Sequence, residues 1–120
     1  MKFITLPSAD GSPWKDPISA TDGLPARKSG EWIAEKHHHL TYFAKMFSTS
    51  MKSKWKHLVY LETFSGPGRC FVSDTGKERP GSPLQIINQD FTRFIFIDIN
   101  TAACRALEQR LTGHPNADKV

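Results

Sequence analysis

The sequence predicts an α/β domain in which crossover helices connect the strands of a parallel sheet. Two short apolar runs, residues 58–61 and 94–97, have the length and the β-branched or aromatic content of buried strands. Each run is followed by an acidic residue, Glu62 or Asp98, and segments with helical periodicity lie before, between and after the two runs. Strands that alternate with helices and are apolar on both faces are typical of parallel sheets, so we expect both strands to be buried.

The composition is that of one small domain and excludes an integral membrane protein. The chain has 120 residues, of which 38% are hydrophobic, and a mean hydropathy of -0.44. It contains no stretch of about 20 apolar residues, and the run 3–6 is too short for a secretory signal. Cys70 and Cys104 have no metal-type spacing and are expected to be reduced. We therefore expect a cytoplasmic protein.

Residues 1–30 are expected to form an irregular arm, because four prolines interrupt any helical or strand period. Between residues 31 and 48, apolar residues recur at helical spacing and predict an amphipathic helix, with Ser29 placed to cap its start. The apolar stripe consists of Trp32, Ile33, Leu40, Phe43, Ala44 and Phe47. Residues 48–53 have no such stripe and are expected to form a loop.

The first strand leads into a sharp turn at Gly66-Pro67-Gly68, which cannot continue an extended strand. Residues 73–81 are polar and rich in turn formers, so we expect an exposed loop there. Ser82 is a good helix N-cap and Pro83 suits the first helical position. These two residues predict a helix from 82 to about 90.

A second amphipathic helix is expected over residues 101–111, where Gly113 and Pro115 follow and end it. The predicted order is therefore helix, strand, helix, strand, helix. Only two strands are visible, whereas a doubly wound sheet has at least about five. We therefore expect residues 31–120 to be the amino-terminal part, or a fragment, of a larger α/β domain.

The glycine turn after the first strand is the candidate ligand site, because open α/β sheets bind nucleotide-like ligands at the carboxyl ends of their strands. A P-loop is excluded, since Gly76-Lys77 is followed by Glu78 instead of Ser or Thr. A dinucleotide site would have a small residue where Phe71 stands. Glu62 at the strand end would in addition repel a pyrophosphate.

S-adenosylmethionine suits these residues better, because it has no phosphate and carries a sulfonium and an ammonium. Glu62 is placed to attract the cationic methionine end, while Gly66 and Gly68 let the backbone approach the ligand. Asp98 is placed to accept hydrogen bonds from both ribose hydroxyls, and Phe64 to line the adenosyl pocket. Two other interpretations stay open: Glu62 as a strand-end charge, and Asp98 as part of an Asx cap of the following helix.

Residues 62–69, Glu-Thr-Phe-Ser-Gly-Pro-Gly-Arg, resemble the first motif of Rossmann-fold methyltransferases. More narrowly, the chain resembles the three-Cys-motif partner proteins over residues 32–111, although it carries Glu62 where aspartate is usual. The matching residues are Trp32, Lys36, His37, Leu40, Tyr42, Phe47, Glu62, residues 64–69 (Phe-Ser-Gly-Pro-Gly-Arg) and residues 81–84 (Gly-Ser-Pro-Leu). The resemblance implies a Rossmann-like fold that binds S-adenosylmethionine through Glu62, Phe64, Ser65, Gly66, Pro67, Gly68 and Asp98.

The implied function is methyl transfer to a nucleic-acid or protein substrate. No catalytic residue is assigned, because in such enzymes the residue that orients the substrate usually follows a fourth strand. Two other classes stay open: a non-catalytic partner of a cysteine-motif protein, and a basic nucleic-acid-binding module. The second depends on an excess of positive charge between residues 27 and 56, where seven basic residues face two acidic ones. The seven are Arg27, Lys28, Lys36, Lys45, Lys52, Lys54 and Lys56.

No metal site is expected. His37, His38 and His39 are adjacent in the sequence, and adjacent residues on a helix point about 100° apart. Three such side chains cannot converge on one ion. Glu35 and His39 share a helix face, but no third ligand accompanies them.

Overall fold

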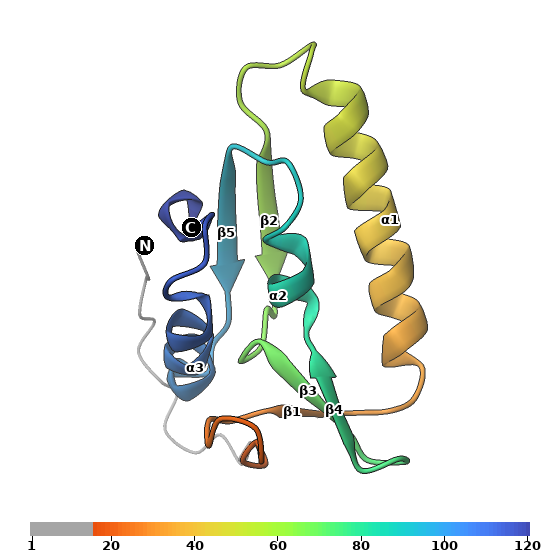
Figure 1. Ribbon diagram of the computed structural model, residues 1–120, viewed down its shortest axis with the longest axis vertical. Coiled ribbons are helices and arrows are strands. Elements are labelled where there is room, and N and C mark those ends of the chain that lie inside the picture. Colours follow the sequence, from red (N-terminus) through yellow and green to blue (C-terminus); the bar gives the residue numbers. More distant parts are fainter. Residues whose placement is uncertain (1–15) are drawn as a thin grey trace.

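The computed structural model describes residues 16–120 and shows a small domain of mixed α/β structure (Figure 1). Strands β2 (Val59–Thr63) and β5 (Arg93–Ile97) form a parallel two-stranded sheet. A second sheet contains β1 (Arg27–Ser29), β3 (Arg69–Val72) and β4 (Lys77–Pro80), in the order β1-β3-β4. The helices are α1 (Ile33–Met51), α2 (Ser82–Ile86), α3 (Thr101–Leu111) and the 3-10 helix η1 (Ala117–Lys119). Within residues 16–120, no helix is long and apolar enough to cross a membrane.

The two apolar runs form a parallel pair, as predicted. Val59 pairs with Arg93 at one end of the sheet and Thr63 with Ile97 at the other. The side chains of Tyr60, Phe94 and Phe96 point to the side on which all three α-helices pack, and together they form one aromatic cluster. This core also contains Ala44 of α1, Ile86 and Ile87, and Leu107 and Leu111 of α3. Burial of each large side chain contributes about 1.5–3 kcal/mol, so this face holds the domain together.

The opposite face of the parallel sheet is exposed. It presents a row of branched apolar side chains, namely Val59, Leu61, Ile95 and Ile97. Leu61 is 57% exposed, because α1, α2 and α3 all pack on the other face. The expectation that both strands are covered on both faces is therefore wrong for the described residues.

The three-stranded sheet is not predicted by the sequence. β1 lies in the expected irregular arm and pairs in parallel with β3, with Arg27 opposite Cys70. β4 lies in the expected loop and forms an antiparallel hairpin with β3. In the turn of this hairpin, Gly76 has a φ of +69° and donates a hydrogen bond from its N–H to the carbonyl of Val72 at 2.8 Å. The arm and loop predictions are thus wrong for residues 27–29 and 77–80, while residues 1–15 of the arm lie outside the described residues.

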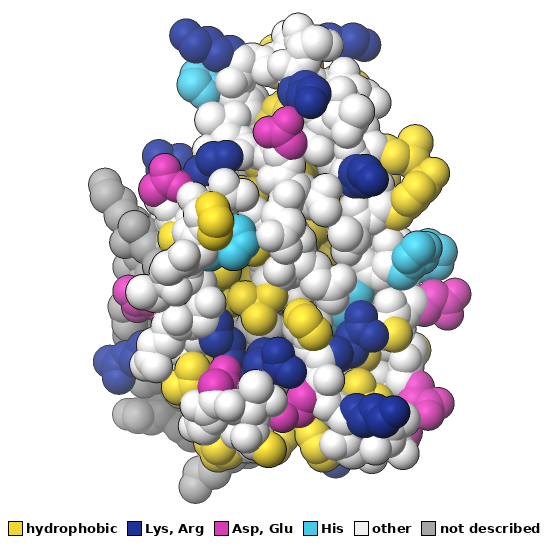
Figure 2. Space-filling view, in the orientation of Figure 1, with side chains coloured by type: hydrophobic (Ala, Val, Ile, Leu, Met, Phe, Trp, Pro, Cys, Tyr) yellow, Lys and Arg dark blue, Asp and Glu magenta, His cyan; other side chains and the backbone are white. Residues whose placement is uncertain are grey.

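Helix α1 is longer than predicted, and only part of the predicted apolar stripe is buried. It continues to Met51, through part of the loop expected at 48–53, and its N-cap is Trp32, whose side chain makes no capping bond. Ser29, the predicted cap, lies in β1. The buried residues of α1 are Ile33, His37, Ala44 and Ser48, whereas Trp32, Phe43 and Phe47 of the predicted stripe are exposed. The half-buried Leu40 and Met51 also pack on the core, and the ring of Phe47 stacks on that of Phe91. Figure 2 shows other hydrophobic side chains protruding from the helix.

The two helices that follow differ in how well the sequence predicted them. α2 has five residues and ends at Ile86, well before the expected end near residue 90, and Gly81 is its N-cap instead of Ser82. α3 spans the predicted residues, 101–111. Its cap is Asn100, whose side-chain oxygen accepts hydrogen bonds from the N–H groups of Ala102 at 3.0 Å and Ala103 at 3.2 Å.

Candidate functional site

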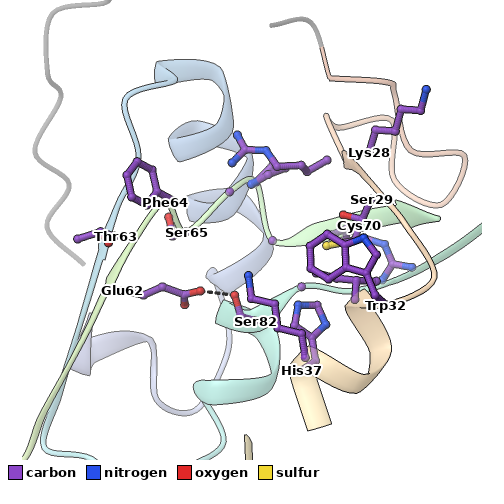
Figure 3. A pocket seen from close by; sticks show the side chains of 18 residues that line it. Lys28, Ser29, Trp32, His37, Glu62, Thr63, Phe64, Ser65, Cys70 and Ser82 are labelled. Carbon is purple, nitrogen blue, oxygen red and sulfur yellow. Dashed lines mark hydrogen bonds between the residues drawn. The ribbon is translucent and has the colours of Figure 1, made fainter. Parts of the chain in front are cut away.

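A cavity of about 360 Å³ opens at the carboxyl end of β2 (Figure 3). Six of the seven residues predicted to bind the cofactor line it, namely Glu62, Phe64, Ser65, Gly66, Pro67 and Gly68. The rest of the lining comes from β1, the first turns of α1, β3 and the start of α2. The volume lies in the range of small-molecule sites, roughly 300–1,000 Å³. The glycine turn and the residues around it therefore form one concave site.

Two glycines that line the cavity, Gly68 and Gly81, allow the glycine turn and the start of α2 to pack closely. Gly68 has a φ of +100°, and a Cβ atom there would lie 3.1 Å from Cδ1 of Leu107. Gly81 donates its N–H to the carbonyl of Gly68 at 2.7 Å, and a Cβ atom on Gly81 would lie 3.0 Å from the same oxygen. Only residues without a side chain allow the turn and the start of α2 to approach so closely. The turn therefore presents backbone to the cavity.

Phe64 stands at the edge of this turn in a strained conformation. Its φ is +64°, which no other non-glycine residue among 16–120 shares, and its side chain is 81% exposed. Such a conformation costs about 1–3 kcal/mol and is typical of functional sites. The next residue fixes the turn to β5, because the N–H of Ser65 donates to the carbonyl of Ile97 at 2.9 Å. The Oγ atom of Ser65 is buried and has no hydrogen-bond partner among the described residues.

Glu62 directs its carboxylate into the cavity, where it meets two neutral hydroxyls. Ser82 donates to one carboxylate oxygen (Figure 3). Tyr60 donates to the other oxygen at 3.4 Å. Burial raises the pKa of Glu62 above 4.5, while these hydroxyls and the charge of Lys36 act in the opposite direction. Within the described residues no cation lies within 4 Å of this carboxylate. Its negative charge is therefore only partly compensated.

Asp98, the seventh predicted residue, is placed differently. It is buried and does not line the cavity. Its Oδ2 atom accepts hydrogen bonds from the N–H of Gly66 at 2.9 Å and from Arg27 at 3.1 Å, and its Oδ1 atom accepts from the N–H of Asn100 at 2.9 Å. Both oxygens are thus engaged within the protein. The observed role of Asp98 is to hold the glycine turn and to form the Asx turn before α3, which was the alternative interpretation; the ribose contact stays a prediction.

Two arginines that support the site were not found from the sequence. Arg27 reaches Asp98 from β1, 71 positions away, and its guanidinium also lies near Asp16 at 3.8 Å. Arg110 of α3 donates to the carbonyl of Pro67 in the turn at 2.7 Å and to both carboxylate oxygens of Asp22 at 2.8 Å. These bonds lower the pKa of Asp22 to about 2. No local pattern marks either arginine, because their partners are distant in sequence.

His37 is the buried titratable group on the α1 side of the cavity. Its Nδ1 atom lies 3.2 Å from Nε2 of Gln85, which also donates to the carbonyl of Pro80 at 3.0 Å. Burial, with smaller effects from Arg79 and Lys36, lowers the pKa of His37 to about 4. The imidazole is therefore neutral at pH 7 and serves as a hydrogen-bonding group.

The cysteines and histidines show no further reactive or metal-binding arrangement. Burial raises the pKa of both Cys70 and Cys104, so both thiols are protonated at neutral pH. Within residues 16–120, no three side chains of His, Cys, Asp or Glu are placed to hold a metal ion. His37 is buried, while His38 and His39 are exposed.

The seven basic residues between 27 and 56 do not form one patch. Arg27, Lys28 and Lys36 line the cavity. The other four lie farther along α1 or in the segment before β2, namely Lys45, Lys52, Lys54 and Lys56. At about 1.5 Å per residue, Lys52 is roughly 24 Å along the helix axis from Lys36. Figure 2 shows Lys and Arg side chains both around the end of α1 and in the lower half of the molecule, near β3 and β4.

Comparisons of the chain with protein-family models, with curated proteins and with solved structures find no match.

Proposed function

We propose that the cavity binds S-adenosylmethionine, and that the chain is a methyltransferase-like protein with a Rossmann-like sheet, similar to the three-Cys-motif partner proteins. The observation that carries the proposal is the position of Glu62. Its carboxylate ends a parallel strand and faces a cavity whose wall is the glycine turn. The carboxyl ends of parallel strands are where α/β folds bind nucleotide-like ligands.

The immediate surroundings of Glu62 favour a cationic group of the ligand. Glu62 is partly buried and contacts only hydroxyl groups, so the free energy of its ionised form is high. A ligand ammonium or sulfonium near the carboxylate lowers that free energy, whereas a ligand phosphate would raise it. S-adenosylmethionine carries both cationic groups and no phosphate.

The backbone around the turn also fits this ligand. Gly68 and Gly81 allow the turn to pack closely on Leu107 and on the start of α2. Both glycines line the cavity, so the nucleoside part would meet their backbone there. The exposed ring of Phe64 provides an apolar surface for the adenosyl group. Asp98 contributes indirectly, because it accepts a hydrogen bond from the N–H of Gly66 and so stabilises the shape of the turn.

When bound, S-adenosylmethionine supplies an electrophilic methyl group. The chain's own contribution is orientation: Glu62 fixes the cationic end, and the turn fixes the nucleoside end. Residues buried around the cavity, including Ile33 and Pro67, exclude water from its inner wall. No residue is assigned as a catalytic base, since His37 is bonded to Gln85 and both thiols are protonated at neutral pH.

Titration calorimetry on the full chain tests this proposal. We expect S-adenosylmethionine to bind with a stoichiometry of one, and ATP, which shares the adenosine but carries phosphates, to bind more weakly because Glu62 repels phosphates. Binding of ATP without binding of S-adenosylmethionine contradicts the proposal, because it would show that the cavity prefers a phosphate to a cation.

One observation favours the non-catalytic partner role as a second candidate. The face of the parallel sheet with Val59, Leu61, Ile95 and Ile97 is apolar and exposed, as protein-binding surfaces are. We propose that, in this role, a cysteine-motif protein covers that face. Co-purification with a candidate cysteine-motif protein should then be lost in Leu61→Lys but kept in Phe43→Lys, which changes an exposed side chain of α1. A complex that survives Leu61→Lys rules out this surface.

A further inference from the structure

We propose that the α1 side of the cavity mouth, formed by Lys28, Trp32 and Lys36 and called here the basic rim, binds single-stranded nucleic acid. The strand would be the methyl acceptor. Only this acceptor role rests on the proposed function, because binding of the strand to the basic rim needs no cofactor.

The first observation is the charge of the cavity lining. It includes four cationic side chains, Arg27, Lys28, Lys36 and Arg69, against the single carboxylate of Glu62. Arg27 and Arg69 have acidic neighbours, since Arg27 lies 3.1 Å from Asp98 and Arg69 lies 3.9 Å from Glu78. Within the described residues, Lys28 and Lys36 have no carboxylate within 4 Å. These two exposed ammonium groups are available for phosphates.

The second observation is the exposed indole of Trp32, which also lies at the cavity. Trp32 is 61% exposed, although it lines the cavity. Its pyrrole edge packs on Gly30, where a Cβ atom would lie only 2.6 Å from Nε1, and the Lys36 ammonium lies over the ring at 5.7 Å from its centroid. A glycine at position 30 therefore allows the ring to stand in this position. An exposed, positioned aromatic ring is a surface on which a base can stack.

The arrangement around the mouth brings these groups together. Figure 3 places Lys28 and Trp32 on one side of the cavity and Phe64 on the other, with Glu62 and Ser82 between them. A strand held on the basic rim would thus keep an unpaired base next to the cavity. Stacking on Trp32 requires a base that is not already stacked in a duplex, so single strands are favoured. An acidic protein segment would use the lysines but would leave the indole without a specific partner.

Fluorescence anisotropy with a labelled 12-nucleotide single strand, without added cofactor, tests the proposal. Trp32→Ala should weaken binding about 10-fold or more, and Trp32→Phe should restore most of it, because base–aromatic stacking contributes about 1–3 kcal/mol per base. Lys28→Gln and Lys36→Gln should each lower the slope of log affinity against log salt by about 0.7. The matched control is Lys54→Gln, an exposed lysine away from the cavity, which should change affinity less than twofold.

Circular dichroism of each variant checks that it is folded. All the substituted positions are exposed, so we expect every variant to fold. The proposal is overturned if the rim variants bind like the parent, if a duplex of the same length binds as tightly as the single strand, or if polyglutamate displaces the strand as well as unlabelled strand does. These outcomes are separate from the cofactor titration. If the strand binds but S-adenosylmethionine does not, only the proposed acceptor role is overturned. If S-adenosylmethionine binds but the strand does not, only the proposed binding of nucleic acid to the basic rim is overturned.

Discussion

Glu62 lies near the carboxyl end of β2 and Asp98 directly follows the parallel strand β5, and the two carboxylates have opposite surroundings. Asp98 has a side chain that is 4% exposed and bonds to a guanidinium and two backbone N–H groups. Glu62 meets only the hydroxyls of Ser82 and Tyr60 and faces the cavity. A carboxylate whose charge is compensated inside the protein belongs to the framework. One whose charge is left partly uncompensated beside a cavity is suited to a ligand cation.

The largest expected effect on stability is at Asp98, the carboxylate whose charge is compensated inside the protein. Asp98→Ala leaves the buried N–H of Gly66 and the partly exposed guanidinium of Arg27 without their acceptor. We expect the free energy of unfolding to fall by about 3 kcal/mol, at the low end for a broken buried ion pair, because the Arg27 side chain is 33% exposed. Urea unfolding followed by circular dichroism measures this loss. Asp118→Ala, at an exposed carboxylate of η1, is the control and should change stability by less than about 0.5 kcal/mol.

A second, smaller effect on stability is expected in the glycine turn, which is bonded to Asp98 and lines the cavity together with Glu62. Gly68→Ala combines an unfavourable φ with a close contact to Leu107, and should cost about 2 kcal/mol or more. Gly76→Ala is a matched control, because its φ is +69° but nothing lies within 4 Å of the added Cβ. The difference between the two variants in thermal or urea unfolding isolates the packing of the turn. Equal losses would show that the close approach at Gly68 has no energetic importance.

The smallest effect on stability is expected at Glu62. Because burial raises its pKa above 4.5, the folded state holds the proton more tightly than the unfolded chain does. The ionised form therefore costs stability as the pH rises through the folded-state pKa, and below pH 4.5 this cost is absent. Glu62→Gln should accordingly raise the free energy of unfolding at pH 8 by less than about 1 kcal/mol.

This stability difference should also depend on pH. The gain in Glu62→Gln should shrink as the pH is lowered toward 4.5, where the parent carboxyl becomes protonated. Unfolding curves at several pH values measure the change. A clear loss of stability in Glu62→Gln at pH 8 would show that Glu62, like Asp98, stabilises the fold in its ionised form. The contrast between the two carboxylates would then be wrong.

The sequence predicted those features that depend on neighbouring residues. The apolar runs of β2 and β5, the breakers at Gly66 and Gly68, and the helical spacing of α3 are local patterns, and the structure contains each of them. The strand-end position of Glu62 followed directly from the first run. Local patterns were therefore sufficient to locate the wall of the cavity.

Features that depend on distant partners were not predictable in this way. The polar strand β4 is stabilised by pairing with β3, and β1 by pairing across more than forty positions, as in Arg27 opposite Cys70. Along α1, Ile33, Leu40 and Ala44 of the predicted stripe pack inward, whereas Phe43 is exposed and Met51, which the stripe did not include, packs on the core. The bond from Arg27 to Asp98 joins residues 71 positions apart, so no local pattern shows that this carboxylate is already paired within the protein.

The most direct test of the account is the affinity of S-adenosylmethionine for the full chain and for two Glu→Gln variants, with a thermal melt of each. Glu62→Gln removes the charge that faces the cavity, whereas Glu108→Gln removes one exposed charge on α3 away from it. We expect Glu62→Gln to bind at least about 10-fold more weakly at an unchanged or slightly higher melting temperature, since bonds to charged groups contribute about 1.5–3 kcal/mol. Glu108→Gln should bind like the parent. Equal affinity in all three proteins, or no binding by the folded parent, would contradict the assignment of Glu62 as the ligand-facing carboxylate.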